Sequence, residues 1–196
     1  FTLLHQDRQI ALSWAQKLKM CYDTADAMAY LHSFEPAIIH RDLKSLNVLL
    51  ESPILCEGDR PVAKVTDFGL SRLKASTSHS TMTVEVGTVH WMAPEIASEK
   101  YDEKVDLYSY AMVLYELIYR AIPFGDWVDD RQIAACVEAG ERPDVDVCPA
   151  DCPGVLISLM KMCWDHVPAK RPTFDQVRKA VAVALEAAVV SSKMSL

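Results

Sequence analysis

The chain has 196 residues, 51% of them apolar and 24% charged, so it is long and apolar enough to bury one substantial core. Its 27 acidic residues outnumber the 20 lysines and arginines, and the formal net charge of −7 argues against a protein that binds the phosphate backbone of nucleic acids. Six cysteines occur without a CxxC pair or a histidine cluster, which predicts free thiols in a reducing compartment rather than a zinc site.

The first predicted element is a helix that begins at Ser13. The sequence SWAQ at 13–16 fits a capping box, in which the serine hydroxyl accepts the amide proton three residues on and the glutamine side chain reaches back. Apolar residues then recur every three or four positions as far as about His32, which predicts one buried stripe. Two short apolar segments follow at 48–50 and 62–65, separated by turn-forming residues, and predict a small hairpin with a surface insertion.

After the hairpin, a segment rich in serine and threonine extends to about residue 88 without helical or strand periodicity, so we expect a loop. Residues 105–119 are apolar almost all round, which predicts a helix that is buried on every side. This stretch contains Asp106 and Glu116 and is too short to span a membrane, and no leader-like segment opens the chain. We therefore expect a cytoplasmic protein without a membrane span in this chain.

Further helices are predicted at 129–139, at 154–164 and from Thr173 onward, where the sequence TFDQ forms a second capping box. We find no internal repeat and no low-complexity linker. The chain is therefore expected to form one compact domain over residues 1–190, followed by a frayed tail over 191–196.

The chemistry of the chain centres on the segment HRDLKSLNVLL, residues 40–50, and on Asp67. Asp42, Asn47 and Asp67 are oxygen-bearing side chains at loop or strand ends, and such ligands suit Mg²⁺ bound together with substrate phosphates. Asp42 is suited to orient or deprotonate an attacking hydroxyl, and Lys44 to offset charge on a phosphate in transfer. On their own, the aspartates can also be turn formers, Asn47 a loop cap and Lys44 a solvated surface charge.

Taken together, these residues resemble a known family. HRDL with its asparagine at the set distance, DFG at 67–69 and APE at 93–95 occur in the order and context of the protein-kinase signature. The segments GTVHWMAPEI at 87–96 and CWDHVPAKRPTF at 163–174 are similar to the tyrosine-kinase-like branch of serine/threonine kinases, which includes the Raf, mixed-lineage and plant-type enzymes. The resemblance covers nearly the whole chain. It implies a mainly α fold with a small β-hairpin region, the large C-terminal lobe of a kinase without its N-terminal β lobe.

By this resemblance, Asp42 is the catalytic base and Lys44 contacts the phosphate of ATP. Asn47 and Asp67 hold Mg²⁺, with Mn²⁺ as an alternative ion. Leu49 lies under the adenine ring, although a plain core leucine is an equally good interpretation of that position. The implied reaction moves the γ-phosphate of ATP to a hydroxyl of a protein substrate.

The resemblance also implies residues that regulate the site. His40 and Phe68 form a stacked ring pair that is characteristic of the active state, and Gly69 completes the DFG triplet. Arg41 is suited to bind a phosphate on the activation loop, because a guanidinium binds phosphate bidentately. The candidate phosphorylation sites are hydroxyl residues of that loop, for which an ordinary polar loop is the simpler interpretation. They are Ser76, Thr77, Ser78, Ser80, Thr81 and Thr83.

Other residues have implied roles in structure and specificity. Glu95 and Arg171 are similar to the family's buried ion pair between the end of the activation segment and the later helices. Asp106 would receive backbone amides of the catalytic loop, and it can also be a simple helix N-cap. Lys44 and Thr88 together favour serine or threonine as the acceptor, with tyrosine or dual specificity as the lesser alternative.

Some parts of a complete kinase do not occur in this sequence. A kinase needs a glycine-rich loop and a strand lysine before its catalytic loop, yet the first glycine is Gly58 and the only lysines before His40 lie inside the first predicted helix. We therefore expect Phe1 to follow the hinge of a longer kinase. We also expect no phosphate transfer by this chain alone, and an exposed apolar surface around Leu49 and Phe68 where the small lobe belongs.

The sequence thus leaves more than one function class open. A serine/threonine kinase lobe, whose partners are ATP, a protein substrate and the missing small lobe, explains why the candidate catalytic residues are intact. The alternative is a one-lobed, kinase-derived scaffold or pseudokinase-like binding module, which has no need of metal ligands. A metal-dependent phosphatase or hydrolase would also use aspartates and Mg²⁺, but it leaves the segments at 93–95 and 163–174 unexplained.

Overall fold

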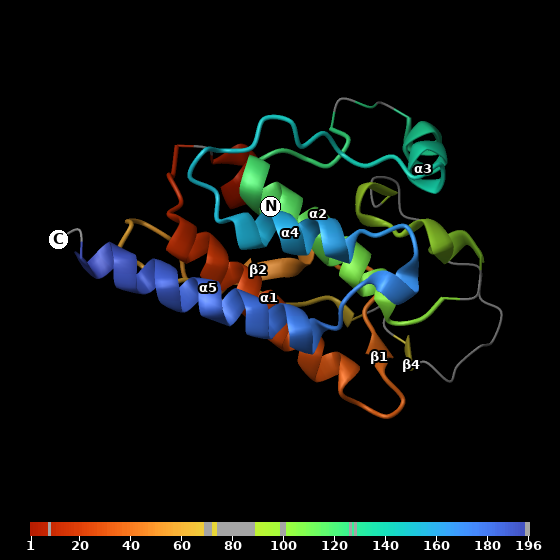
Figure 1. Ribbon diagram of the computed structural model, residues 1–196, viewed down its shortest axis with the longest axis horizontal. Helices are drawn as coiled ribbons and strands as arrows, with labels where there is room; N and C mark the ends of the chain where they lie inside the picture. Colours follow the sequence, from red (N-terminus) through yellow and green to blue (C-terminus); the bar gives the residue numbers. More distant parts are fainter. Residues whose placement is uncertain are drawn as a thin grey trace.

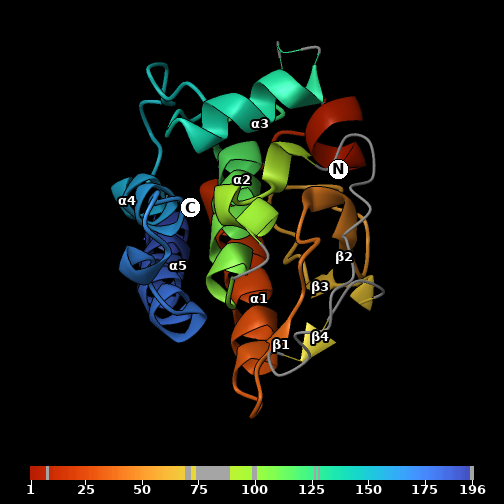
Figure 2. The same ribbon diagram turned by 90° about the vertical axis from the view of Figure 1, so that its right-hand side faces the viewer.

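The computed structural model describes residues 1–7, 9–68, 72–73, 89–98, 101–125, 127 and 129–194. The fold is mostly helical and carries two small two-stranded sheets on one side (Figures 1 and 2). In chain order the elements are η1 (Thr2–Gln6), α1 (Trp14–His32), β1 (Ile38–Ile39), η2 (Ser45–Asn47), β2 (Val48–Leu50), β3 (Ala63–Val65), β4 (Arg72–Leu73), η4 (Val89–Trp91), η5 (Pro94–Ser98), α2 (Lys104–Tyr119), α3 (Asp130–Glu138), α4 (Gly154–Cys163), η6 (Pro168–Lys170) and α5 (Phe174–Met194).

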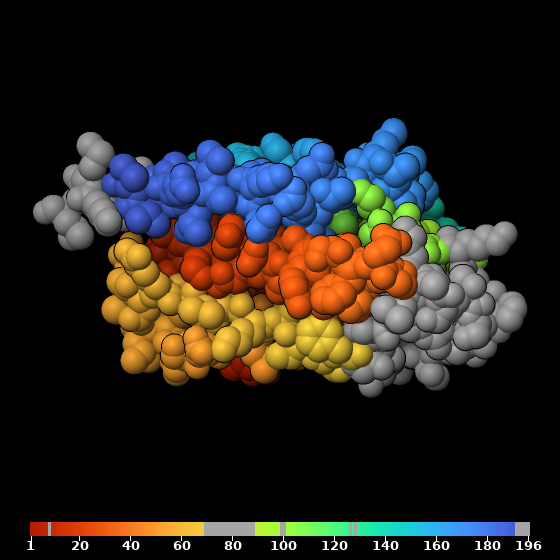
Figure 3. Space-filling view, turned by 90° about the horizontal axis from the view of Figure 1, so that it is seen from below, coloured from red at the N-terminus to blue at the C-terminus, as the bar shows by residue number. Residues whose placement is uncertain are grey.

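Helices α1 and α5 lie side by side, and the space-filling view shows α1 between α5 and the segment that holds the β2–β3 hairpin (Figures 1 and 3). Helix α1 begins as predicted, because the Ser13 hydroxyl accepts the Gln16 amide at 3.3 Å and the Gln16 side chain accepts the Ser13 amide at 3.0 Å. Thr173 and Gln176 form the same reciprocal pair before α5. The predicted apolar stripe of α1 is buried, as at Leu18.

Helix α2 runs through the centre of the fold, as the apolar sequence predicts (Figure 2). Every residue from 105 to 118 is buried. The Tyr110 hydroxyl donates to the Cys21 carbonyl oxygen of α1 at 2.9 Å. After the last turn, Arg120 adopts a left-handed conformation with φ of 51°, and its guanidinium donates to the Ile10 carbonyl oxygen at 2.7 Å. The central helix therefore binds the N-terminal segment as well as the long helices.

Strands β2 and β3 form the predicted hairpin, an antiparallel pair in which Val48 lies opposite Val65. The loop between them is bound to α1, since the side-chain amide of Gln16 donates to the Cys56 carbonyl oxygen at 2.8 Å. The predicted surface insertion is thus anchored to the core. A second antiparallel sheet pairs β1 with β4. The sequence did not predict this sheet, because two-residue strands carry no periodicity.

The later helices lie close to their predicted positions. The Asp129 side chain accepts the Arg131 amide at 2.9 Å at the start of α3, and Gly140, with φ of 93°, follows the end of that helix. Helix α5 extends to Met194, past the start of the tail expected to fray over 191–196. In the described part of the chain, no helix is both long enough and apolar enough to cross a membrane. The mainly α fold with its β hairpin is the one expected for the large lobe of a kinase.

Candidate active site

The segment between β1 and β2 brings together three of the predicted catalytic side chains. Lys44 Nζ lies 2.8 Å from Asp42 Oδ2. Asn47 Nδ2 donates to the same carboxylate oxygen at 2.9 Å and to the Asp42 carbonyl oxygen at 2.8 Å. The three residues are between 5% and 7% exposed. Because two donors hold one oxygen, the Asp42 carboxylate has a defined orientation.

The second carboxylate oxygen of Asp42, Oδ1, is buried and accepts no hydrogen bond from the residues that the structure describes. A buried acceptor without a donor costs free energy, and such an atom in a native protein calls for an explanation. A substrate hydroxyl would supply the missing donor. Lys44 meanwhile balances the charge of the carboxylate. The arrangement is therefore suited to hold a hydroxyl proton at Oδ1 while Oδ2 is held in place.

Strand pairing brings the segment before Asp67 onto residues 40–47 between β1 and β2, the predicted catalytic loop. The Thr66 amide donates to the Asn47 carbonyl oxygen at 2.9 Å, and His40 Nε2 donates to the Thr66 carbonyl oxygen at 3.0 Å. Because a carbonyl only accepts, Nε2 carries the proton and Nδ1 accepts the Asp42 amide at 3.3 Å. Asp67 follows directly, exposed and with a left-handed φ of 63°. Hydrogen bonds therefore join the two segments that carry the predicted metal ligands, Asn47 and Asp67.

Two apolar side chains beside the catalytic loop are open to solvent. The rings of His40 and Phe68 have centroids 5.4 Å apart and are tilted by 57°, so the predicted ring pair is present. Phe68 is 48% exposed, and Leu49 is 53% exposed. The interpretation of Leu49 as a plain core leucine is therefore wrong. Both side chains are accessible to a nucleotide or to a further structural element.

Asp106, in the first turn of α2, is fully buried and binds the backbone of the predicted catalytic loop. Its Oδ2 accepts the His40 amide at 2.8 Å, and its Oδ1 accepts the Arg41 amide at 2.8 Å. His32 Nε2 lies 2.9 Å from Oδ2. The N-cap of α2 is Glu103, so the interpretation of Asp106 as an N-cap is wrong. Arg41 has a left-handed φ of 72°, a conformation that such bonds help to hold.

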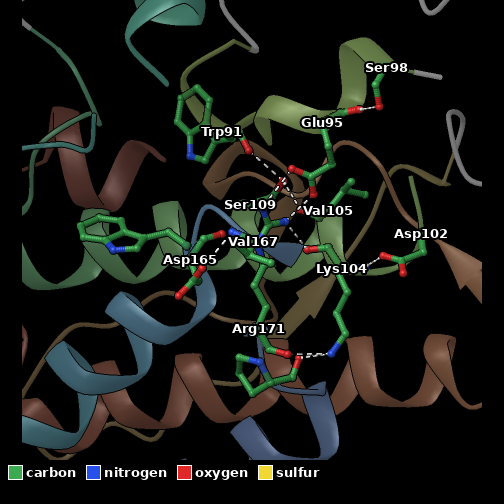
Figure 4. Close-up of polar contacts among 12 residues, drawn as sticks. Trp91, Glu95, Ser98, Asp102, Lys104, Val105, Ser109, Asp165, Val167 and Arg171 are labelled. Carbon is green, nitrogen blue, oxygen red and sulfur yellow. Dashed lines mark hydrogen bonds and ion pairs between the residues drawn. The ribbon is translucent and has the colours of Figure 1, made fainter. Parts of the chain in front are cut away.

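Glu95 and Arg171 form the predicted ion pair, with Nη1–Oε1 and Nη2–Oε2 distances of 2.5 Å and 2.9 Å. Figure 4 shows the surrounding network. Arg171 Nε donates to the Asp165 carbonyl oxygen at 2.8 Å, and Nη1 also donates to the Lys104 carbonyl oxygen at 2.9 Å. Lys104 Nζ donates to the carbonyl oxygens of Arg171 and Pro172 at 2.7 Å and 2.8 Å. The network joins η5, α2 and the start of α5.

Glu116 is a buried residue of this region that belongs to none of the sequence motifs of the site. It is fully buried in α2. Its Oε1 accepts the Ser45 hydroxyl at 2.5 Å and lies 2.7 Å from His5 Nε2, while its Oε2 accepts the Trp91 indole N–H at 2.7 Å. The signal in the sequence was an acidic side chain near the end of a helix whose residues are mostly apolar. Glu116 thus connects the catalytic loop, η4 and the N-terminal segment.

Several predicted residues lie outside the described residues: Gly69, Thr88, Ser76, Thr77, Ser78, Ser80, Thr81 and Thr83. Arg41 is described, and its guanidinium carbon lies 5.2 Å from the ring centroid of Tyr101. Among the described residues, no three His, Cys, Asp or Glu side chains are grouped so that they could hold a metal ion. A cation at this site would therefore need the amide oxygen of Asn47 and oxygens of its substrate, a ligand set that Mg²⁺ often uses.

Comparison with known proteins identifies the class to which this fold and site belong. Residues 2–181 match the model of the family described as protein tyrosine and serine/threonine kinase. The match covers most of the chain, which therefore belongs to the protein kinase family.

Curated relatives agree with this assignment. The chain is 41% identical over 172 residues to the probable serine/threonine-protein kinase drkD of Dictyostelium discoideum, an alignment covering 87% of this chain and 12% of that protein. It is 41% identical over 170 residues to the probable serine/threonine-protein kinase roco7 of the same organism, an alignment covering 84% of this chain and 6% of that protein. It is also 39% identical over 165 residues to the putative serine/threonine-protein kinase/receptor R818 of Acanthamoeba polyphaga mimivirus, where the alignment covers 84% of this chain and 9% of that protein. The chain thus spans 12% or less of these relatives.

Proposed function

We propose that this chain is the catalytic large lobe of a serine/threonine kinase that moves the γ-phosphate of ATP to a protein hydroxyl. The observation that carries the proposal is the arrangement around Asp42, whose Oδ2 is held by Lys44 and Asn47 while its Oδ1 has no donor among the described residues. A carboxylate with one oxygen fixed and one available is what a base needs to orient a hydroxyl for attack.

The other site residues have distinct parts in this proposal. Lys44 contacts the phosphate in transfer and offsets its negative charge. Asn47 and Asp67 hold Mg²⁺, or alternatively Mn²⁺, because the Asn47 side chain donates to Asp42 through its amide nitrogen, which leaves the amide oxygen as a ligand. When bound, the ion would supply positive charge at the phosphate oxygens. Asp106 holds the backbone of the loop so that these side chains keep their positions.

The acceptor is proposed to be serine or threonine. The names of the relatives specify serine/threonine kinases, and Lys44 follows the catalytic aspartate by two residues. The segments at 87–96 and 163–174 support membership of the tyrosine-kinase-like branch. We also propose a cytoplasmic location. Tyrosine or dual specificity is the lesser alternative.

Activation is proposed to use a phosphate on one of the hydroxyl residues from 76 to 83, bound by Arg41. Mass spectrometry of active protein should find phosphate in that segment, and replacing all of its hydroxyl residues with alanine should lower activity. Full activity of the alanine variant would contradict this part of the proposal.

The chain by itself is not expected to transfer phosphate, because its 196 residues include no glycine-rich loop before the catalytic segment. Leu49 and Phe68, about half exposed, would contact the nucleotide and a small lobe. The same exposure favours a second candidate function, a one-lobed binding module that captures the small lobe of another kinase.

The test joins the chain to the small lobe of one of its relatives. The fusion is expected to transfer labelled phosphate from ATP with Mg²⁺ to serine and threonine peptides and not to tyrosine peptides. The Asp42→Asn variant should lower kcat by roughly 10²–10⁴-fold with its fold retained. Chelation of the metal should abolish transfer. A folded fusion without activity would favour the binding module, and activity that Asp42→Asn leaves unchanged would contradict the role proposed for Asp42.

A further inference from the structure

Two cysteines lie together in the segment between α3 and α4, outside the candidate active site. Cys148 and Cys152 are four residues apart, and between them the Cys152 amide donates to the Pro149 carbonyl oxygen at 3.0 Å in a turn. The Cys148 thiol donates to the Pro149 carbonyl oxygen at 3.6 Å and the Cys152 thiol to the Pro153 carbonyl oxygen at 3.8 Å, and the two side chains interact. Both are free thiols, Cys148 exposed and Cys152 half-buried. One thiol is thus open to a reagent in solution, and the other is adjacent to it.

The segment that carries the cysteine pair is bound to the last residue of α2. The Tyr119 hydroxyl donates to the Val145 carbonyl oxygen at 3.3 Å, which holds the start of the segment against the central helix. The Cys148 side chain also interacts with Tyr119, and burial, reinforced by this neighbour, raises the pKa of the tyrosine above its ordinary value. The hydroxyl therefore stays neutral and can remain a donor. The two thiols are held by the folded protein and not by a free loop.

The charge of a buried cation acts on Cys152. Lys17 of α1 is 7% exposed, and its Nζ lies 4.1 Å from the ring centroid of Trp14. In the part of the chain that the structure describes, no carboxylate forms an ion pair with Lys17, and burial lowers the pKa of its ammonium. Burial likewise raises the pKa of Cys152 to about 12, while the charge of Lys17 acts in the opposite direction. Lys17 therefore favours the Cys152 thiolate relative to burial alone.

We propose that Cys148 and Cys152 are a redox-active dithiol, a modification site that hydrogen peroxide oxidises to an intrachain disulfide. The Cys148 sulfur attacks one peroxide oxygen, the O–O bond breaks, and the leaving hydroxide takes up a proton to become water. The product is a sulfenic acid at Cys148. The Cys152 sulfur then loses its proton and attacks the Cys148 sulfur, the S–O bond breaks, and a second water leaves. Two thiols lose two electrons and two protons to one peroxide.

The disulfide would close a ring across residues 148–152 and hold that ring on the end of α2. The charge of Lys17 favours the attacking thiolate of Cys152, so the lysine is expected to act in the second step. Disulfides in reducing compartments are usually transient and signal the redox state, so the bond is expected to be reversed by added dithiothreitol. This inference is independent of the proposed kinase activity.

The test counts thiols in the 196-residue chain before and after hydrogen peroxide. Alkylation of the unfolded protein should modify all six cysteines of the untreated chain and two fewer after oxidation. Peptide mapping should place the disulfide between Cys148 and Cys152, and dithiothreitol should restore both thiols. Gel filtration should show that the oxidised chain has not become a disulfide-linked dimer.

Matched variants separate the pair from general oxidation. Cys148→Ser and Cys152→Ser should each prevent the loss of two thiols, while Cys56→Ser, at another exposed cysteine, should leave it unchanged. Lys17→Met, with circular dichroism to confirm the fold, should slow disulfide closure roughly three- to tenfold and lengthen the lifetime of a sulfenic acid trapped by a 1,3-diketone. Lys19→Met is the control, because Lys19 is paired with Asp23.

The proposal is overturned if the oxidised chain still alkylates at all six cysteines, or if the two thiols are lost equally in Cys148→Ser. An unchanged closure rate in folded Lys17→Met would remove the role assigned to the lysine.

Discussion

The guanidinium of Arg171 binds both carboxylate oxygens of Glu95, a residue 76 positions earlier in the chain. Arg171 is 2% exposed, and its other hydrogen bonds reach the carbonyl oxygens of Asp165 and Lys104. The arginine therefore connects η5, which contains Glu95, to the segment before the last helix. Removing one member of such a pair leaves the other charged and desolvated.

The first prediction concerns this pair. Arg171→Met is expected to lower the free energy of unfolding by about 3–5 kcal/mol, since it leaves the Glu95 charge and two carbonyl oxygens without their donor. The double variant Glu95→Leu/Arg171→Met should be less destabilised than the sum of the two single changes. Urea unfolding followed by circular dichroism measures each value.

Arg178→Met is the matched control, because the ion pairs of Arg178 lie at the surface and should contribute about 1 kcal/mol or less. A loss in Arg171→Met no larger than in the control would contradict the prediction.

Asp106 gives the second prediction. Asp106→Asn keeps the shape of the side chain but places an amide N–H₂ opposite the backbone amide of either His40 or Arg41, so one hydrogen bond is lost and two donors face each other. We expect about 2–4 kcal/mol of destabilisation and faster hydrogen exchange at these two amides. Asp102→Asn, at a side chain that accepts the Lys104 amide near the same helix end, should cost about 1 kcal/mol. Equal exchange rates at the His40 amide in both variants would argue against the role of Asp106.

The third prediction concerns Glu116. Glu116→Gln can accept on one side only, so either the Trp91 indole N–H or the Ser45 hydroxyl loses its acceptor. The expected cost is about 2–3 kcal/mol, with a shift of the Trp91 indole proton resonance. Ser45→Ala should cost less, about 1 kcal/mol, because it removes one of the three side chains that contact the Glu116 carboxylate. An unshifted Trp91 resonance in folded Glu116→Gln would show that this carboxylate does not hold the tryptophan.

Asp59 makes the hairpin loop sensitive to acid, which is the fourth prediction. Its carboxylate accepts the amides of Leu55 at 2.6 Å and Cys56 at 2.8 Å, and these bonds hold its pKa below the ordinary value. Because the folded pKa is depressed, the stabilising contribution is present above the unfolded value, about 3.9, and is lost as the pH falls through the folded value. Protection factors of the Leu55 and Cys56 amides should fall on acidification, and Asp59→Asn should remove that pH dependence. Unchanged protection across this range would contradict the assignment.

The sequence predicts the local elements well because capping residues and apolar runs lie in short, continuous segments of the chain. The Ser13 and Thr173 capping boxes locate the starts of α1 and α5, and the apolar run at 105–119 predicts the buried α2. The β1–β4 sheet escapes prediction because its strands are two residues long and far apart in the chain. The anchoring of the hairpin loop by Gln16 escapes it for the same reason, since the partners lie 40 residues apart.

By itself, the sequence determined the family, the order of the helices and which residues are candidates for catalysis, because motif spacing, capping and periodicity are written in short segments. Only the tertiary structure decided between the alternatives that the sequence left open for Leu49 and Asp106, and only it showed that Glu116 joins three distant segments. The physical reason is that a buried carboxylate is stable only where folding brings donors to it, and these donors come from positions 25 to 111 residues away along the chain.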